Sequence, residues 1–92
     1  MEIVKRLLVT NQHGLHARAS TKFVEIAQRF ASDVFLSRGD SADNEVNGKS
    51  VLGIMTLGAE KGHEIVVRVV GKDAEKALHA LEALVRADFH GV

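Results

Sequence analysis

The order of apolar patterns along this chain predicts an α+β fold. The predicted architecture is an open-faced sandwich, in which a four-stranded antiparallel sheet carries three helices on one face (β-α-β-β-α-β-α). Short stretches of alternating apolar and polar residues interleave with two longer stretches whose apolar residues recur every three or four positions. The strands are too short and too few for a sheet covered on both faces, which favours helices on one face of an antiparallel sheet. Ninety-two residues without a repeat or linker predict a single domain over 1–92.

The first half of the chain predicts a strand and a helix joined by a turn. Residues 2–10 place apolar side chains on one face at a period of two, interrupted by Lys5, and run into a turn at 11–14. Residues 17–30 have the apolar spacing of one helical face, with charged residues mostly on the other side.

The second half predicts three strands and two helices. Residues 34–37 form a short strand, and the polar stretch 38–46 reads as a turn and a weak edge strand. Residues 50–57 are apolar over a length that suits a strand or a short helix, and Ser50 as an N-cap favours the helix. A strand over 65–69 follows, and then a helix over 74–85 that Asp73 is expected to cap. 

Composition excludes several classes of protein. Twelve basic residues balance twelve acidic ones, and Trp and Tyr are absent, which argues against a nucleic-acid binder. The chain has no Cys, so a disulfide framework and a thiolate metal site are impossible. The charged N-terminus has neither a signal peptide's apolar region nor a membrane span, so we expect a cytoplasmic protein without membrane insertion.

The segment Gly14-Leu15-His16-Ala17-Arg18 stands where the first turn becomes the first helix. Free backbone N–H groups and the helix dipole converge there and favour an anion such as phosphate. The imidazole of His16 is a nucleophile when neutral, and the guanidinium of Arg18 matches phosphoryl oxygens. These residue types suit a phosphohistidine site, with His16 as the phosphoryl acceptor and Arg18 as the cation that holds the phosphoryl group.

Other readings of His16 remain open from the residues alone. A histidine at a helix start is commonly a surface residue or a local cap. His13 and His16 could bind a metal, but no Cys or nearby carboxylate joins them, so no metal site or cofactor is predicted. A small hydrolase would need Glu64 or Asp33 brought beside His16 by folding, and no nucleophile stands at a recognisable spacing.

Two motifs carry a resemblance to a known family. GLHARAS before an amphipathic helix, and VNGKSVLGIMTLGAEKG downstream, resemble the histidine-containing phosphocarrier HPr family of the bacterial sugar phosphotransferase system and its nitrogen-branch paralogues. The resemblance covers essentially the whole chain and maps the phosphorylated histidine onto His16 and its arginine onto Arg18. It implies a phosphoenolpyruvate-dependent enzyme I as donor, an enzyme IIA-type domain as acceptor, and no independent turnover.

The chain departs from the family pattern at two places. Ala19 replaces the family's usual proline, which removes a residue pre-set for the first helical turn and leaves the sugar branch open. The stretch 38–45 is longer than the family's loop and third strand, which we expect to alter an edge only. Within it, Arg38-Gly39-Asp40 spells an adhesion tripeptide that we interpret as a turn.

Ser50 is the second candidate site. In relatives that carry the VNGKS motif, the corresponding serine is phosphorylated by an ATP-dependent HPr kinase, so the resemblance implies a regulatory phosphosite. A cap on the short helix is compatible with that role.

Transient partners require a docking surface around His16. The apolar residues predicted for it are Val51, Leu52, Ile54 and Met55. The small residues predicted to give a partner room are Ala17, Ala19 and Ser20. Arg18 and Lys49 are the predicted cations at the rim of this surface. A carrier must leave His16 accessible, which favours a monomer. A core role for the apolar residues is equally open.

A second function class is a regulatory interaction module, close to the nitrogen-branch paralogue, in which phosphorylation controls partner binding. Onward transfer distinguishes the two, because a carrier passes phosphate to an acceptor whereas a signal module keeps it.

Overall fold

The computed structural model describes residues 1–92, apart from the side chain of Ala42. Its elements in chain order are β1 (Glu2–Leu8), α1 (Ala17–Ala27), β2 (Asp33–Arg38), β3 (Ser41–Asn47), α2 (Val51–Met55), β4 (Glu64–Val70), α3 (Ala74–Arg86) and α4 (Asp88–Gly91). The predicted order is confirmed, and α4 is a fourth, one-turn helix that the sequence analysis did not foresee. Among the described residues, no helix has both the length and the apolar character needed to cross a bilayer.

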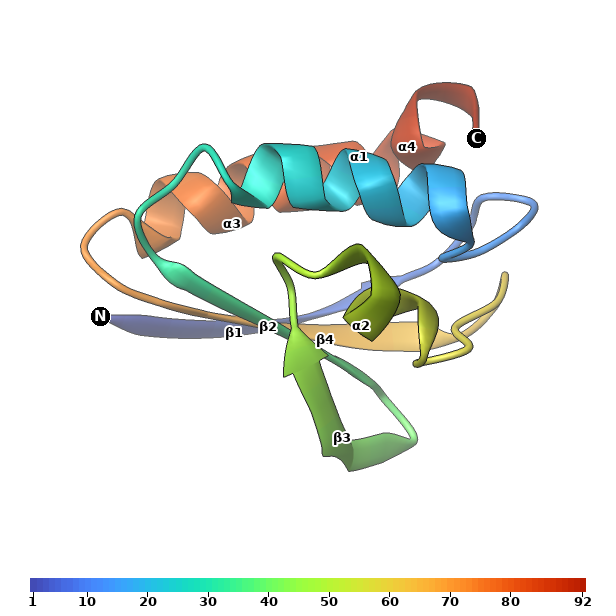
Figure 1. The fold of residues 1–92 in the computed structure, drawn as a ribbon, viewed down its shortest axis with the longest axis horizontal. Helices are drawn as coiled ribbons and strands as arrows, with labels where there is room; N and C mark the ends of the chain where they lie inside the picture. The colour runs from blue at the N-terminus through green and yellow to red at the C-terminus, as the bar shows by residue number, and fades with distance from the viewer.

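The four strands form one antiparallel sheet in the order β1-β4-β2-β3. Val70 lies opposite Glu2 of β1 and Asp33 of β2, so β4 is a central strand. The helices lie on one face of this sheet, with α1 and α3 side by side and α2 beside α1 (Figure 1). The open-faced sandwich is therefore confirmed, and β3 is an edge strand as expected.

The core lies between the sheet and the helices. Ile65, Val67 and Val69 alternate inward along β4 and are fully buried, which is the period-two pattern of a half-covered strand. Lys5, which interrupts the inward face of β1, reaches the Glu82 carboxylate of α3 with its ammonium group at 3.2 Å. The charge on this face is thus paired at the rim of the core.

The adhesion-like tripeptide is a hairpin turn. Gly39 and Asp40 connect β2 to β3, and the Arg38 guanidinium donates to both carboxylate oxygens of Asp40, at 2.8 and 3.1 Å. This hydrogen bonding lowers the pKa of Asp40 below its ordinary range. Arg38 also donates to the main-chain oxygens of Leu57 and Gly58, so the hairpin is tied to the loop that follows α2.

Helix α1 ends at Ala27, three residues before the predicted end. The N–H groups of Arg29 and Phe30 donate to carbonyls three residues earlier, whereas an α-helix would use carbonyls four residues earlier. The chain therefore leaves the α-helix in a tighter turn. Phe30 still packs on the core, so the apolar spacing ran past the helix end.

The predicted side-chain cap of α3 by Asp73 is wrong. Asp73 stands at the N-cap position, but its side chain makes no capping bond. Its carboxylate instead accepts from the N–H groups of Ala31 and Ser32, at 2.8 and 2.9 Å, and from the Ser32 hydroxyl. Asp73 therefore joins the start of α3 to the loop before β2.

The last residues of the chain have a left-handed backbone conformation. This explains why the sequence shows no helical spacing of apolar residues at α4. Asp88, Phe89 and His90 have φ values of 52°, 54° and 60°. Phe89 is fully buried, and its carbonyl accepts from the Lys22 ammonium at 3.0 Å. Burial and this hydrogen bond hold a conformation that is costly for residues with side chains.

Candidate functional site

A tight turn places His16 at the start of α1. The buried side chain of Asn11 donates from its amide to the carbonyl of Gly14 at 2.8 Å, and the Gly14 N–H donates back to Asn11. Gly14 has φ +63°, and a Cβ there would lie 2.4 Å from the carbonyl oxygen of Ala59. Only glycine satisfies both the conformation and the close approach.

The N-terminus of α1 presents unpaired donors beside His16. Buried Leu15 donates its N–H to the Ala59 carbonyl at 2.9 Å, and the first helical bond runs from Ser20 to the carbonyl of His16. His16 is therefore the N-cap residue, but its side chain makes no capping bond, and the first turn contains no acidic residue. The N–H groups of residues 17–19 are left to an external acceptor, in the positive field of the helix end.

The imidazole of His16 is open to solvent, with 61% of its side chain exposed. Its Nε2 atom lies 3.0 Å from Oε1 of Glu60. The Glu60 N–H in turn donates to Nδ1 of His63 at 2.9 Å, which fixes the turn that carries the carboxylate. Glu60 is thus the charged neighbour of His16, brought there across 44 positions of sequence.

Glu60 is not identified by the sequence. The carboxylates predicted as candidates for folding beside His16 are Glu64 and Asp33, and neither is its partner. Glu64 pairs with Arg6 at 3.3 Å, and Asp33 lies at the far end of β2, opposite Val70. The only available signal was the position of Glu60 in the second family-like motif, which does not by itself reveal a contact.

His13 stacks beside His16, with ring centroids 6.3 Å apart and planes inclined by 28°. In the part of the chain that the structure describes, no three His, Asp or Glu side chains are arranged to hold a metal ion. The pair is a stacked contact at the edge of the turn.

Arg18 lies on the exposed side of the first turn of α1. No ion-pair partner for its guanidinium is found among the described residues. The group is therefore able to approach an anion at the helix end without breaking an existing salt bridge.

Two of the small residues predicted to make room for a partner are not on the surface. Ala19 and Ser20 are fully buried, and the Ser20 hydroxyl donates to the Leu15 carbonyl at 2.9 Å. They lie on the face of α1 that packs on the core, whereas Ala17 is exposed. Ala19 and Ser20 therefore support the turn, and Ala17 alone of the three can touch a partner directly.

Helix α2 divides its apolar residues between core and surface. The Ser50 hydroxyl accepts from the N–H of Gly53 at 3.1 Å, so the predicted cap is confirmed. Leu52 and Met55 are 76% and 40% exposed, whereas Ile54 is fully buried. Ile54 belongs to the core because its position on α2 faces the sheet. Leu52 and Met55, with half-buried Val51 beside them, remain as an exposed apolar pair.

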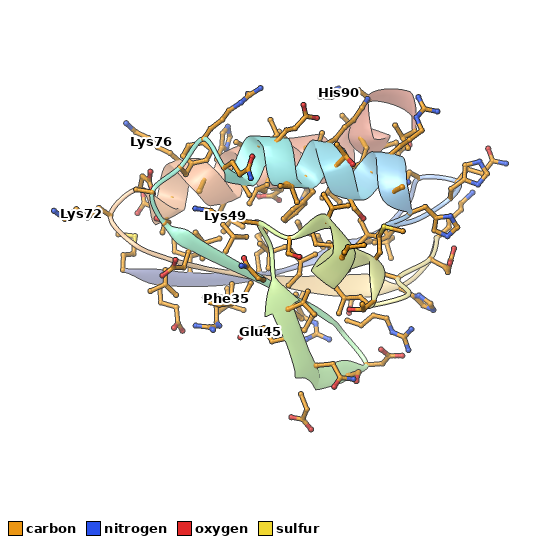
Figure 2. All side chains as sticks on the ribbon, in the orientation of Figure 1. Phe35, Glu45, Lys49, Lys72, Lys76 and His90 are labelled. Carbon is orange, nitrogen blue, oxygen red and sulfur yellow. The ribbon has the colours of Figure 1, made fainter. Side chains whose placement is uncertain are left out.

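Lys49, the second predicted rim cation, lies near the end of α1 that is opposite to His16. Its ammonium donates to the carbonyl of Phe30 at 2.9 Å, just beyond the C-terminal end of α1. Figure 2 shows Lys49 near that end of the helix. Helix α1 has 11 residues and is about 16 Å long, and His16 lies at its opposite end. The motif's spacing did not reveal which end of α1 faces Lys49, and its role at the rim of the docking surface stays a prediction.

Comparisons with known proteins agree with one another. The model of the PTS-HPr family, described as the PTS HPr component phosphorylation site, matches residues 3–87. Phosphocarrier protein HPr of Neisseria meningitidis serogroup A is 43% identical over 81 residues, which are 88% of each chain. HPr of Xylella fastidiosa strain 9a5c is 43% identical over 84 residues, 91% of each chain. The crystal structure of HPr from Bacillus anthracis has a TM-score of 0.82 at 40% identity, and the match covers 91% of this chain and 96% of that one.

Proposed function

The chain belongs to the HPr family of phosphocarriers of the bacterial phosphotransferase system. On that premise we propose that His16 accepts a phosphoryl group from a phosphoenolpyruvate-dependent enzyme I. His16 then passes the group to an enzyme IIA-type domain. The single observation that carries this proposal is the position of the exposed His16 ring at the N-cap of α1, beside N–H groups that have no helical partner. We expect this carrier to act in the cytoplasm as a monomer, because a partner must reach His16.

The two ring nitrogens have different surroundings. Nε2 faces Glu60, whereas Nδ1 has no hydrogen-bond partner among the described residues. The Nδ1 lone pair is therefore the nucleophile. Its attack on phosphorus breaks the bond to the donor, and the electron pair of that bond stays on the donor.

The helix end stabilises the phosphoryl group after transfer. The N–H groups of residues 17–19 supply donors to its oxygens, and the dipole of α1 favours the negative charge. Arg18 completes the site as a cation that contacts the phosphoryl oxygens. All of these groups bind the product and none activates water, which suits a protein that stores the group for a partner.

Ser50 serves as a regulatory phosphosite for an HPr kinase/phosphorylase. Its hydroxyl lies at the N-cap of α2, next to the exposed Leu52 and Met55. A phosphate there would add nearly two negative charges beside an apolar docking pair. It would impede partner binding without altering the chemistry at His16.

Onward transfer tests the proposed function. The protein is charged with labelled phosphoenolpyruvate and catalytic enzyme I, separated from the donor, and mixed with an enzyme IIA-type domain, with His16→Ala run in parallel. Label appearing on the IIA-type domain supports the carrier. Label that stays on the wild-type chain with an active IIA-type domain would contradict the carrier and favour the regulatory module.

A further inference from the structure

We propose that Glu60 is a positioning residue for His16, which holds the ring proton on Nε2 and thereby keeps the Nδ1 lone pair available for phosphoryl transfer. This inference rests on the proposed function, and it adds a residue that the local motif around His16 does not contain. The observation behind it is the contact of 3.0 Å between Nε2 of His16 and Oε1 of Glu60.

The chemistry of the two groups fixes the direction of this hydrogen bond. An ionised carboxylate can only accept, so Nε2 must be the donor and must carry the ring proton. A neutral imidazole has one ring proton, and Nδ1 is then left with its lone pair. An unrestrained imidazole samples both tautomers, and the one protonated on Nδ1 cannot attack phosphorus with that nitrogen.

The main chain that carries the Glu60 carboxylate is itself held in place. The Glu60 N–H donates to Nδ1 of His63 at 2.9 Å, and the His63 N–H donates to the Glu60 carbonyl at 3.0 Å. The carbonyl of the preceding residue, Ala59, accepts from Leu15 in the turn before His16. The main chain of Glu60 is thus fixed within its own turn, and the bond from Leu15 to Ala59 ties that turn to the loop before His16.

The contact also acts on the phosphorylated ring. After transfer to Nδ1 the proton stays on Nε2, and the ring carries a positive charge that the Glu60 carboxylate stabilises. In the onward step the P–Nδ1 bond breaks, its electron pair returns to Nδ1, and the imidazole leaves as a neutral group with its proton still on Nε2. His13 stacks on this ring, His63 accepts from the Glu60 N–H, and Arg18 stands two residues further on the exposed side of α1.

Nitrogen NMR of histidine-labelled protein tests the inference in the wild type, Glu60→Ala and Glu60→Gln. Glu75→Gln, an exposed glutamate at the distant start of α3, is the matched control. In the wild type and the control, His16 should show a protonated Nε2 and an unprotonated Nδ1. In Glu60→Ala both nitrogens should move towards averaged shifts, and in Glu60→Gln they should lie between. Identical His16 shifts in Glu60→Ala and the wild type would overturn the inference.

Transfer rates give the second readout. Glu60→Ala should accept phosphate from enzyme I roughly threefold to fivefold more slowly, the scale that a solvent-exposed charged pair supports. An unchanged rate would overturn the role in transfer. If the wild type shows the expected nitrogen shifts but is not phosphorylated at all, the proposed function fails, and the proton-holding contact stands apart from it.

Discussion

The ammonium group of Lys49 donates to the main-chain carbonyl of Phe30, at the end of α1 opposite to His16. A lysine at a helix C-terminus satisfies an otherwise unpaired carbonyl and interacts favourably with the negative end of the dipole. Lys49 therefore joins the loop before α2 to the end of α1, and its charge contributes to stability.

Lys49→Glu should lower the free energy of unfolding by about 1 kcal/mol, because it removes a hydrogen bond from a charged donor and places a negative charge at a helix C-terminus. Urea denaturation measures this, with Lys72→Glu on an exposed loop as control. The rate at which enzyme I phosphorylates His16 should stay the same at low salt. A markedly slower reaction would indicate that Lys49 contributes to partner binding at the rim of the docking surface.

Ser50→Ala should destabilise the protein by about 1 kcal/mol, the usual value of an N-cap hydroxyl. The lost contact is the bond from the Gly53 N–H to the Ser50 hydroxyl. Ser50→Asp should recover most of this loss, because a carboxylate also caps, and should bind phosphotransferase partners more weakly than Ser50→Ala. Equal stability of the wild type and both variants in urea would contradict the capping role.

Gly14→Ala should be among the most damaging single-methyl additions in this chain. The new Cβ would meet the Ala59 carbonyl at 2.4 Å while the residue keeps φ +63°, so the loss should be about 3 kcal/mol or more. Gly62→Ala is the control, since φ there is +96° but nothing lies within 4 Å of the added Cβ. Its cost should be only about 1 kcal/mol in thermal unfolding. Similar losses for the two variants would contradict the close approach at Gly14.

Asp73 should make stability depend on acid pH. Hydrogen bonds from the Ser32 hydroxyl and from the N–H groups of Ala31 and Ser32 lower the pKa of Asp73 from its ordinary 3.8. Its contribution is therefore fully present above that value and is lost as the pH falls through the lower pKa of the folded state.

Asp73→Asn should accordingly be less stable than the wild type at pH 7, and the difference should shrink below about pH 4. Unfolding in urea at several pH values measures it, with Asp33→Asn as control. A difference that stays constant down to pH 2 would contradict the account.

The sequence predicted the fold well because its signals were local. Alternation in β4 and the apolar stripe of α3 each report a face that must be buried, and helices on one face of an antiparallel sheet follow from their order. The end of α1 and the left-handed turn at Asp88–Gly91 were not predicted, because no regular spacing of apolar residues marks either of them. Both depend on packing of an aromatic side chain, Phe30 and Phe89.

The candidate site was predicted only in part. His16 and Arg18 lie within one turn of the chain, so their neighbourhood was visible in the sequence. Glu60 was invisible because a loop far along the chain brings it to Nε2. The burial of Ser20 and Ile54 was equally hidden, since a motif does not show which of its residues face the core.

The central claim is that His16 is the phosphoryl acceptor. The most direct measurement is the intact mass of the protein after incubation with phosphoenolpyruvate and enzyme I, for the wild type, His16→Ala and, as a matched control, His13→Ala. The account predicts one acid-labile phosphoryl group on the wild type and on His13→Ala, and none on His16→Ala. A phosphoryl group that persists in His16→Ala, or a wild type left unmodified by an active enzyme I, would contradict it.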